Sequence, residues 1–379
     1  MNKILDRYAQ QKATPVTLRQ LLFYERHRTT ERLLKSANYV RHELPIRIAH
    51  RLREFQNLPF IVGVNPHMQQ VYRLYWEAFD RLRSVPPIKT QQDNERFCEL
   101  LYTSLQAHLV VIPQLALGIQ ECEQHMNREK RDKFMNSTLR SRISRRVLAE
   151  QHLILSNCVM IFQHCSAHRT LGACIEKAHT LYPQIPVIVE DGPDIDFAYV
   201  GDHIEYILYQ LLLNAMQHAN NINHTNNVSS SSSVPIRVTM CTNATDVFFR
   251  ISDQAGGISP EVYRSIYSFG HHATGNFQHF KTWKATVSDD QQQKQQQKEQ
   301  EQSVNMPLGM GLPMSKVYAE YWGGDLNIQT LHGWGTDAYV RIPKLGDQLE
   351  HLDVEDHASD LHVELDSGSD VTHRRRFVI

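Results

Sequence analysis

Three glycine-containing segments in the second half of the chain constrain its fold more than any other feature. They read Ile251-Ser-Asp-Gln-Ala-Gly-Gly-Ile258, Pro307-Leu-Gly-Met-Gly-Leu-Pro313 and Gly333-Trp-Gly-Thr-Asp337. Glycine lets a backbone turn tightly, or approach a neighbouring group without a Cβ in the way. The three segments therefore predict a domain in which strand ends and a helix start come close together.

The hydrophobic pattern divides the chain into two parts. Residues 15 to about 170 interleave charged and apolar side chains at spacings of three and four, with few glycines, which is typical of a helical bundle. After about residue 180, residues 187–189, 236–240 and 247–251 alternate with period two and indicate strands. We expect an α+β protein with a helical domain over residues 1–175 and a sheet-containing domain over residues 176–346.

Composition excludes several classes of protein. The 379 residues carry 40 Lys and Arg against 41 Asp and Glu, so the charge balance predicts no nucleic-acid or membrane-surface partner. The longest apolar stretch, residues 109–119, is about half the ~20 residues that a membrane span requires, so we expect no span. The six cysteines form no CxxC pair, which argues against a zinc site and fits a reducing compartment.

Several segments have open interpretations. The first 24 residues hold one acid against four basic residues, which fits a matrix-targeting segment and chance equally well. The serine run 229–233 indicates a surface loop, and the glutamine-rich residues 291–302 cannot form a core. Residues 347–370 hold nine acids and no Lys or Arg, so residues 347–379 are either a solvated tail or a docking tail.

Polar residues recur on one stripe of the helix expected over residues 203–218. The stripe consists of His203, Tyr206, Gln210, Asn214 and Gln217, opposite an apolar face. Such a stripe is usually a solvent face, but the carboxamide oxygen of Asn214 is also a suitable ligand for Mg²⁺.

Each glycine segment can be interpreted as part of a nucleotide site or as an ordinary structural turn. Asp253, at the end of the strand that begins at residue 246, could accept the exocyclic amine of adenine, or belong to an ordinary turn. Gly309 and Gly311 precede a helix expected over residues 312–321, whose first N–H groups would face phosphate oxygens. Residues 326–329 and 338–342 indicate a hairpin, with Thr336 at the start of the return strand.

Taken in order, Asn214, Asp253-x-Ala-Gly-Gly257, Gly309-x-Gly311 and Gly335-Thr336 resemble the nucleotide-binding boxes of the GHKL ATPases, which include histidine kinases, gyrase and the Hsp90 class. Segments of the helical half, residues 41–47, 109–118 and 142–152, resemble the mitochondrial 2-oxo acid dehydrogenase kinases. So do residues 318–325 and 333–338, and the resemblance covers residues 17 to 345.

The resemblance implies a four-helix-bundle domain followed by a GHKL-type α/β sandwich, with an ATP lid over residues 265–306. It implies a serine kinase that uses Mg²⁺ and ATP and phosphorylates the E1 α subunit of the pyruvate or branched-chain 2-oxo acid dehydrogenase in the mitochondrial matrix. It also implies a dimer that binds the E2 lipoyl domain, near Leu21, Leu22 and Phe23 if these are not core residues. The implied nucleotide site has Asn214 as the Mg²⁺ ligand, Asp253 as the adenine partner, Thr336 near the base, and Gly257, Gly309, Gly311 and Leu312 as lining.

Four residues depart from the family pattern on the helix that carries Asn214. Gln210 and Tyr206 stand where the kinases carry a glutamate base and a histidine. Leu213 and Gln217 replace a lysine and an arginine beside the asparagine, which removes two positive charges near the phosphates. Glutamine cannot accept a proton at neutral pH, so His203 is a candidate surrogate acting through water. The departures leave open an active kinase and an ATP-binding, catalytically weak partner of a paralogous kinase. A third alternative is a histidine kinase with His152 as phosphoacceptor. We expect His152 instead to be a structural or inter-domain residue.

Overall fold

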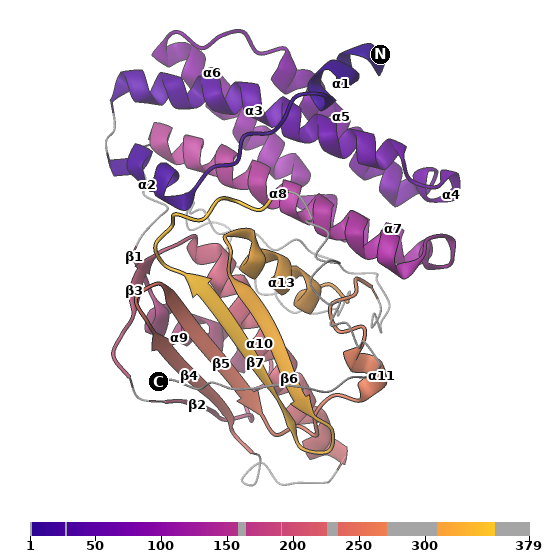
Figure 1. Cartoon of the computed structure of the whole chain (residues 1–379), viewed down its shortest axis with the longest axis vertical. Helices are drawn as coiled ribbons and strands as arrows, with labels where there is room; N and C mark the ends of the chain where they lie inside the picture. Colours follow the sequence, from indigo (N-terminus) through magenta and orange to yellow (C-terminus); the bar gives the residue numbers. More distant parts are fainter. Residues whose placement is uncertain are drawn as a thin grey trace, which may run out of the picture.

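The computed structural model describes residues 2–26, 29–157, 164–190, 192–225, 234–270 and 309–352. The serine run 229–233, the glutamine-rich residues 291–302, most of the expected lid and residues 353–379 lie outside the described residues. The helical half and the sheet-containing half form two layers, one above the other in Figure 1.

Long helices make up the N-terminal half. Their starts follow from local sequence: the Thr29 side chain caps one helix, Thr90 and Asp93 form a capping box for another, and Asn65 followed by Pro66 starts a third. The elements are α1 (Asn2–Ala9), α2 (Leu18–Arg26), α3 (Thr30–Gln56), α4 (Phe60–Gly63), α5 (Pro66–Arg83), α6 (Gln91–Ala107), η1 (His108–Val110), α7 (Val111–Glu121), η2 (Glu123–His125) and α8 (Arg128–Asn157).

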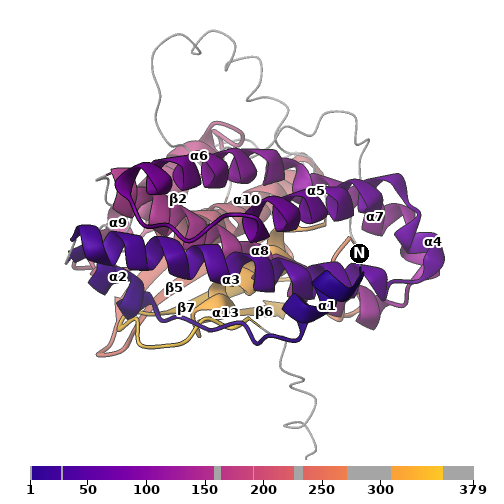
Figure 2. The same cartoon turned by 90° about the horizontal axis from the view of Figure 1, so that it is seen from above.

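The expected four-helix bundle is confirmed. Helix α3 packs against α5 and α8, α6 packs against α8, and α7 continues from α6 and packs against α5. Figure 2 shows these helices lying side by side above the rest of the molecule. Their shared interior is apolar and buried, which is the packing that the helical spacing of apolar residues predicted.

One helical run in the described part of the chain could cross a membrane by length and composition alone. It spans Gln91–Glu121 and includes α6, η1 and α7. Core helices meet the same criterion, and Leu101, Val111 and Leu115 of this run are buried in the bundle. A single run of this kind therefore carries little weight.

The C-terminal half is built around a five-stranded sheet with the order β2-β4-β5-β7-β6. Its elements are β1 (His164–Ser166), α9 (Ala167–His179), β2 (Val187–Val189), β3 (Asp196–Ala198), α10 (Gly201–Thr225), β4 (Ile236–Thr242), β5 (Asp246–Asp253), α11 (Pro260–Tyr263), α13 (Gly311–Tyr321), β6 (Asp325–Leu331) and β7 (Gly335–Pro343). The strands alternate buried and accessible residues, so one face is apolar. Helices α9, α10 and α13 cover that face, and α13 also contacts α8 of the bundle (Figure 1).

Two chain segments far apart in sequence close the outer side of the bundle. Residue Thr17 pairs with Leu349, and Arg19 N donates to Gly346 O at 2.7 Å. Glu350, whose side chain is fully buried, accepts from Arg47 Nη2 at 2.7 Å and from Val16 N at 3.1 Å. The first residues of the expected acidic tail are therefore docked on the helical domain of their own chain.

This docking buries two charged side chains of α3. Arg47 and Arg51 are 3% and 6% exposed. The face they occupy is covered by the terminal segments, and Arg47 is paired with Glu43 at 3.0 Å as well as with Glu350. A buried charge requires such partners, and the partner 303 residues away is not visible from the helix pattern.

Candidate functional site

Helix α10 carries the expected polar stripe and lies on the sheet beside α13. It contacts both β5 and α13. Its apolar residues Ile204, Ile207, Leu208, Leu211 and Leu212 are buried, while Gln210 and Asn214 are half-buried and Gln217 is exposed. The helix therefore presents two carboxamides, one turn apart, beside the start of α13.

Asp253 ends β5 directly opposite Thr336 of β7. Its Oδ1 accepts from Ala255 N at 2.8 Å, and burial raises the pKa of its carboxyl group, an effect that this hydrogen bond opposes. The neighbouring Thr330 Oγ1 accepts from Ile258 N at 2.8 Å and lies 3.2 Å from Thr336 Oγ1. The strand ends thus hold a carboxylate and two hydroxyl groups in one place. Thr330 was not predicted, because a threonine in a strand carries no special signal.

Glycine is required where these strand ends meet the turn after β5. Gly257 has φ +66°, and a Cβ on it would lie 2.2 Å from Leu331 O. A Cβ on Gly335 would lie 2.1 Å from Asp253 O. Gly256 also takes part, because its N donates to Trp334 O at 3.1 Å. The close backbone approach that the glycine segments predicted is therefore present here.

The glycine segment over residues 307–313 forms the start of α13. Gly309 has φ +63°, and Gly311 is the first residue of the helix. A Cβ on Gly311 would lie 2.5 Å from Gln210 Oε1, so the helix start and the Gln210 carboxamide are in direct contact. Among the described residues no side chain caps this helix start, which leaves its first N–H groups available to an anion. Leu312 is partly buried beside them.

His203 of the stripe is buried, whereas Tyr206 is half-buried like the two carboxamides. The His203 ring is 4.7 Å from the Tyr318 ring, and the Tyr206 ring is 5.0 Å from it, both on the side facing α13. Burial lowers the pKa of His203 to about 3, and burial raises the pKa of Tyr206 far above its usual value. His203 is two helical turns from Gln210 and 7% exposed, so its position gives no support to a water-mediated role in catalysis.

His152 is a structural residue of the bundle. It is fully buried, with Nδ1 3.2 Å from Ser36 Oγ and Nε2 2.9 Å from Asn94 Oδ1, and burial lowers its pKa to about 4. Both ring nitrogens are engaged inside the bundle, which argues against a phosphoacceptor. Of the two expected roles, structural and inter-domain, these contacts favour the structural one, because the partners come from α3 and from the start of α6.

The three residues suggested for lipoyl binding have different environments in α2. Leu21 is buried, Leu22 is partly buried against the core, and Phe23 is 49% exposed. Only Phe23 therefore offers a large apolar surface to a partner.

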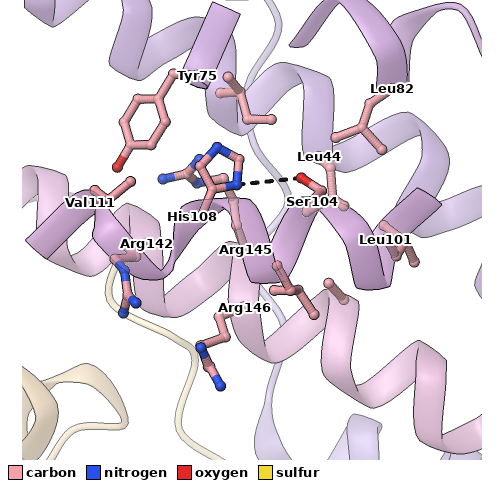
Figure 3. A pocket seen from close by; sticks show the side chains of 13 residues that line it. Leu44, Tyr75, Leu82, Leu101, Ser104, His108, Val111, Arg142, Arg145 and Arg146 are labelled. Atoms are coloured by element: carbon pink, nitrogen blue, oxygen red, sulfur yellow. Dashed lines mark hydrogen bonds between the residues drawn. The ribbon is translucent and has the colours of Figure 1, made fainter. Parts of the chain in front are cut away.

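A separate cavity lies inside the bundle (Figure 3). Arg142, Arg145 and Arg146 of α8 line it together with Tyr75 and His108. The Arg145 guanidinium lies 4.3 Å from the centre of the Tyr75 ring, and burial, reinforced by Arg145, lowers the pKa of His108 to about 4. Three arginines from one helix therefore border the cavity, and one of them, Arg146, forms an ion pair with Glu150 at 2.6 Å.

The five-stranded sheet, the three covering helices and the glycine turns at the strand ends and at the start of α13 are those of an ATPase domain of the histidine kinase, gyrase B and HSP90 class. Residues 199–346 match the family described as "Histidine kinase-, DNA gyrase B-, and HSP90-like ATPase". Proteins of this class use ATP. Residues 15–169 match the family described as "Mitochondrial branched-chain alpha-ketoacid dehydrogenase kinase".

Full-length relatives cover both domains. A mitochondrial pyruvate dehydrogenase (acetyl-transferring) kinase of Arabidopsis thaliana is 30% identical over 90% of this chain and 93% of its own length. Pyruvate dehydrogenase kinase 2 of Saccharomyces cerevisiae is 28% identical over 92% of this chain and 84% of its length. The human isozyme 4 is 25% identical over 97% of this chain. The chain belongs to the mitochondrial 2-oxo acid dehydrogenase kinase family.

Proposed function

We propose that this chain is an ATP-dependent protein serine kinase that phosphorylates the E1 α subunit of a mitochondrial 2-oxo acid dehydrogenase complex, namely pyruvate dehydrogenase. The observation that carries the proposal is the contact between the uncapped start of α13 and Gln210 of α10, one turn from Asn214. The relatives named above are pyruvate dehydrogenase kinases, which supports the choice of substrate.

The site fits a magnesium nucleotide. Asp253 retains acceptor capacity after its bond to Ala255 N, and adenine's exocyclic amine needs such an acceptor. Thr336 and Gly257 would border the base, while Gly309, Gly311 and Leu312 would face the phosphates. Asn214 would supply one oxygen to Mg²⁺, whose remaining ligands are commonly phosphate and water oxygens. ATP, when bound, supplies the phosphoryl group, and Mg²⁺ balances its charge.

Gln210 would position rather than deprotonate the substrate hydroxyl. Its carboxamide has no basic pair at neutral pH, but its oxygen accepts a hydrogen bond and therefore orients an attacking hydroxyl. Phosphoryl transfer depends mainly on positioning and electrostatic stabilisation, and a general base contributes about 10²–10⁴-fold. We therefore expect slow but real transfer.

The partners and location follow from the family. We propose residence in the mitochondrial matrix, because the relatives are named as mitochondrial proteins. We further propose binding to the E2 lipoyl domain, with Phe23 of α2 as the accessible contact. Assembly would be as a homodimer or as a heterodimer with a paralogous kinase.

A second candidate function is that of an ATP-binding, catalytically weak subunit that supports an active paralogue. The burial of His203 and Tyr206, with pKa values shifted away from neutrality, favours it, because neither side chain can replace a glutamate base.

The test is phosphorylation of purified E1 by the purified chain with Mg²⁺ and ATP. We expect slow phosphorylation by the wild-type protein and a 10²–10⁴-fold faster rate for Gln210→Glu. Gln69→Glu is the matched control, since it makes the same exchange at an exposed position of α5 in the helical domain and should leave the rate unchanged.

The outcomes separate the two functions. If neither the wild type nor Gln210→Glu phosphorylates E1, but the wild type accelerates a paralogous kinase, the partner function replaces the kinase. If the wild type does not bind ATP, both proposals fail.

A further inference from the structure

The segment that follows α11 is held against the first turns of α8. Ser265, Ser268 and Phe269 are 1%, 4% and 2% exposed, so this stretch is part of the packed interior although it has no regular secondary structure. Gly270, the last described residue of this stretch, lies against Gly309 in the glycine segment over residues 307–313. The segment therefore lies between the helical domain and the proposed phosphate-binding helix start.

Asp132 of α8 makes the contact. Its Oδ2 accepts from Ser268 Oγ at 2.7 Å, and its Oδ1 accepts from Phe269 N at 2.9 Å. Arg131, 4% exposed, donates from Nη2 to the same Ser268 Oγ at 3.3 Å. One carboxylate thus holds both a side chain and a main-chain amide, and hydrogen bonds to a charged acceptor are the stronger kind.

The contact continues to the proposed nucleotide site without a gap. Gly270 N donates to Gly309 O at 3.1 Å, and a Cβ on Gly309 would lie 3.0 Å from Gly270 Cα. Two residues later, Gly311 begins α13 and touches Gln210 Oε1. A displacement of Gly270 therefore moves Gly309, and with it the first amides of α13.

Helix α8 also holds the other end of α13. Arg140 forms an ion pair with Glu320 in the last turn of that helix. Asp132 acts on the start of α13 through Gly270 and Gly309, while Arg140 acts on its end. A single rigid helix of the bundle thus determines where the amides of the α13 start point.

We propose that Asp132 is a positioning residue for the nucleotide site: it fixes Gly309 and the start of α13 through Ser268, Phe269 and Gly270, and thereby couples the helical domain to ATP affinity. This inference rests on the proposed function, since it concerns the same site. Asp132 does not touch the site itself, so its effect must pass through the segment it holds.

The interface offers a matched control. Arg128 Nη2 donates to Arg264 O at 2.6 Å, which joins the same two elements but involves neither Ser268 nor Phe269. Its Nε lies 3.8 Å from Asp132 Oδ2, a long and partly exposed ion pair of a kind that contributes little. General adhesion between the domains would make Arg128→Ala and Asp132→Ala alike. Positioning requires that only Asp132→Ala affects the start of α13.

The experiment uses the full chain and two readouts. Calorimetric titration with Mg²⁺ and ATP gives the nucleotide affinity, and hydrogen–deuterium exchange without nucleotide reports on the Phe269 and Gly270 amides. We expect Asp132→Ala to weaken ATP binding about tenfold, within the usual range of coupling between sites, and to accelerate exchange at both amides. Asp132→Asn, which keeps an acceptor for Phe269 N, should lie between this variant and the wild type, and Arg128→Ala should match the wild type.

Equal ATP affinity in wild type and Asp132→Ala would overturn the inference, as would equal effects of Asp132→Ala and Arg128→Ala. Should Asp132→Ala not fold, Asp132→Asn and Ser268→Ala decide the question by the same measurements. If the wild type binds no ATP, the proposed function fails, while the exchange comparison still decides whether Asp132 positions Gly270.

Discussion

Asp253 combines a proposed role in nucleotide binding with a cost to stability. Its carboxyl group sits at the end of β5, where burial raises its pKa, while Ala255 N bonds to one oxygen. Residues kept in an unfavourable environment are frequent at functional sites, because the environment that strains them also shapes the ligand contact. The same residue therefore allows affinity and stability to be tested separately.

Asp253→Ala should weaken ATP binding by about 10- to 150-fold, because losing a hydrogen bond to a charged group costs about 1.5–3 kcal/mol. Isothermal titration measures this. Asp337→Ala is the control, since Asp337 is next to Thr336 in β7 but pairs with Arg250 on the surface. If the two variants bind ATP alike, Asp253 does not contact the nucleotide.

The raised pKa of Asp253 also predicts a pH dependence. A carboxyl group whose pKa is higher in the folded than in the unfolded state holds its proton more tightly when folded, so its contribution to stability falls as the pH rises above the ordinary aspartate value. Asp253→Asn removes this term. The stability of the variant relative to wild type should therefore increase between about pH 4 and pH 7, as followed by urea unfolding. A constant difference over that range would contradict the assignment.

At the scale of elements, the hairpin of β6 and β7 is locked to the turn after β5. Gly257 meets Leu331 O, and Gly333 N donates to Gly256 O at 2.7 Å. Both Gly257 and Gly333 have positive φ, but only Gly257 lacks space for a side chain, since nothing lies within 4 Å of a Cβ on Gly333. Alanine substitutions at these two glycines therefore distinguish the cost of a positive φ from the cost of a steric clash.

Gly257→Ala should therefore destabilise the protein by about 1–3 kcal/mol more than Gly333→Ala. The Gly333 variant suffers only from the unfavourable φ, whereas the Gly257 variant also meets a steric clash. It should also weaken ATP binding, because the turn must move away from Leu331. Denaturant unfolding and nucleotide titration on both variants measure the two effects. Equal stability of the variants would mean that the turn relaxes at no cost.

Local sequence was sufficient to predict the elements that carry the site. The strand at residues 187–189 has the predicted bounds, and the helix expected over residues 312–321 begins one residue earlier, at Gly311. The helix expected over 203–218 extends to Thr225, because its polar last turns lack the apolar spacing used to set its end. The periodicity of apolar residues reflects the burial of one face of a helix or strand. It therefore locates helices and strands well but their ends poorly.

At the scale of the whole molecule, the two layers are held together by buried charge as well as by apolar packing. Glu350 contacts Arg47 of the bundle, Val16 near the N-terminus and the hydroxyl of Tyr321 at the end of α13. Arg47 and Glu350 side chains are 2% and 0% exposed. Removing one member of such a cluster leaves the remaining polar and charged groups buried without their partner.

Glu350→Ala should lower the free energy of unfolding by about 3–5 kcal/mol, the usual cost of breaking a buried ion pair from one side. Lys35→Ala, which removes an exposed pair with Glu31, should leave the unfolding free energy unchanged. Chemical denaturation of both variants tests the contrast. A small effect of Glu350→Ala would mean that water replaces the lost carboxylate and that the docking of the terminal segment contributes little to stability.

The sequence by itself determined the two-domain α+β organisation, the strands, the glycine turns and the family, because these depend on local periodicity and on residues close together in the chain. Only the tertiary structure decided that Arg47 and Glu350 are paired inside, that His203 and His152 are buried and neutral, and that Asp132 holds Phe269. Each of these depends on a partner from a distant part of the chain, which sets burial and hydrogen bonding and leaves no periodic trace in the sequence.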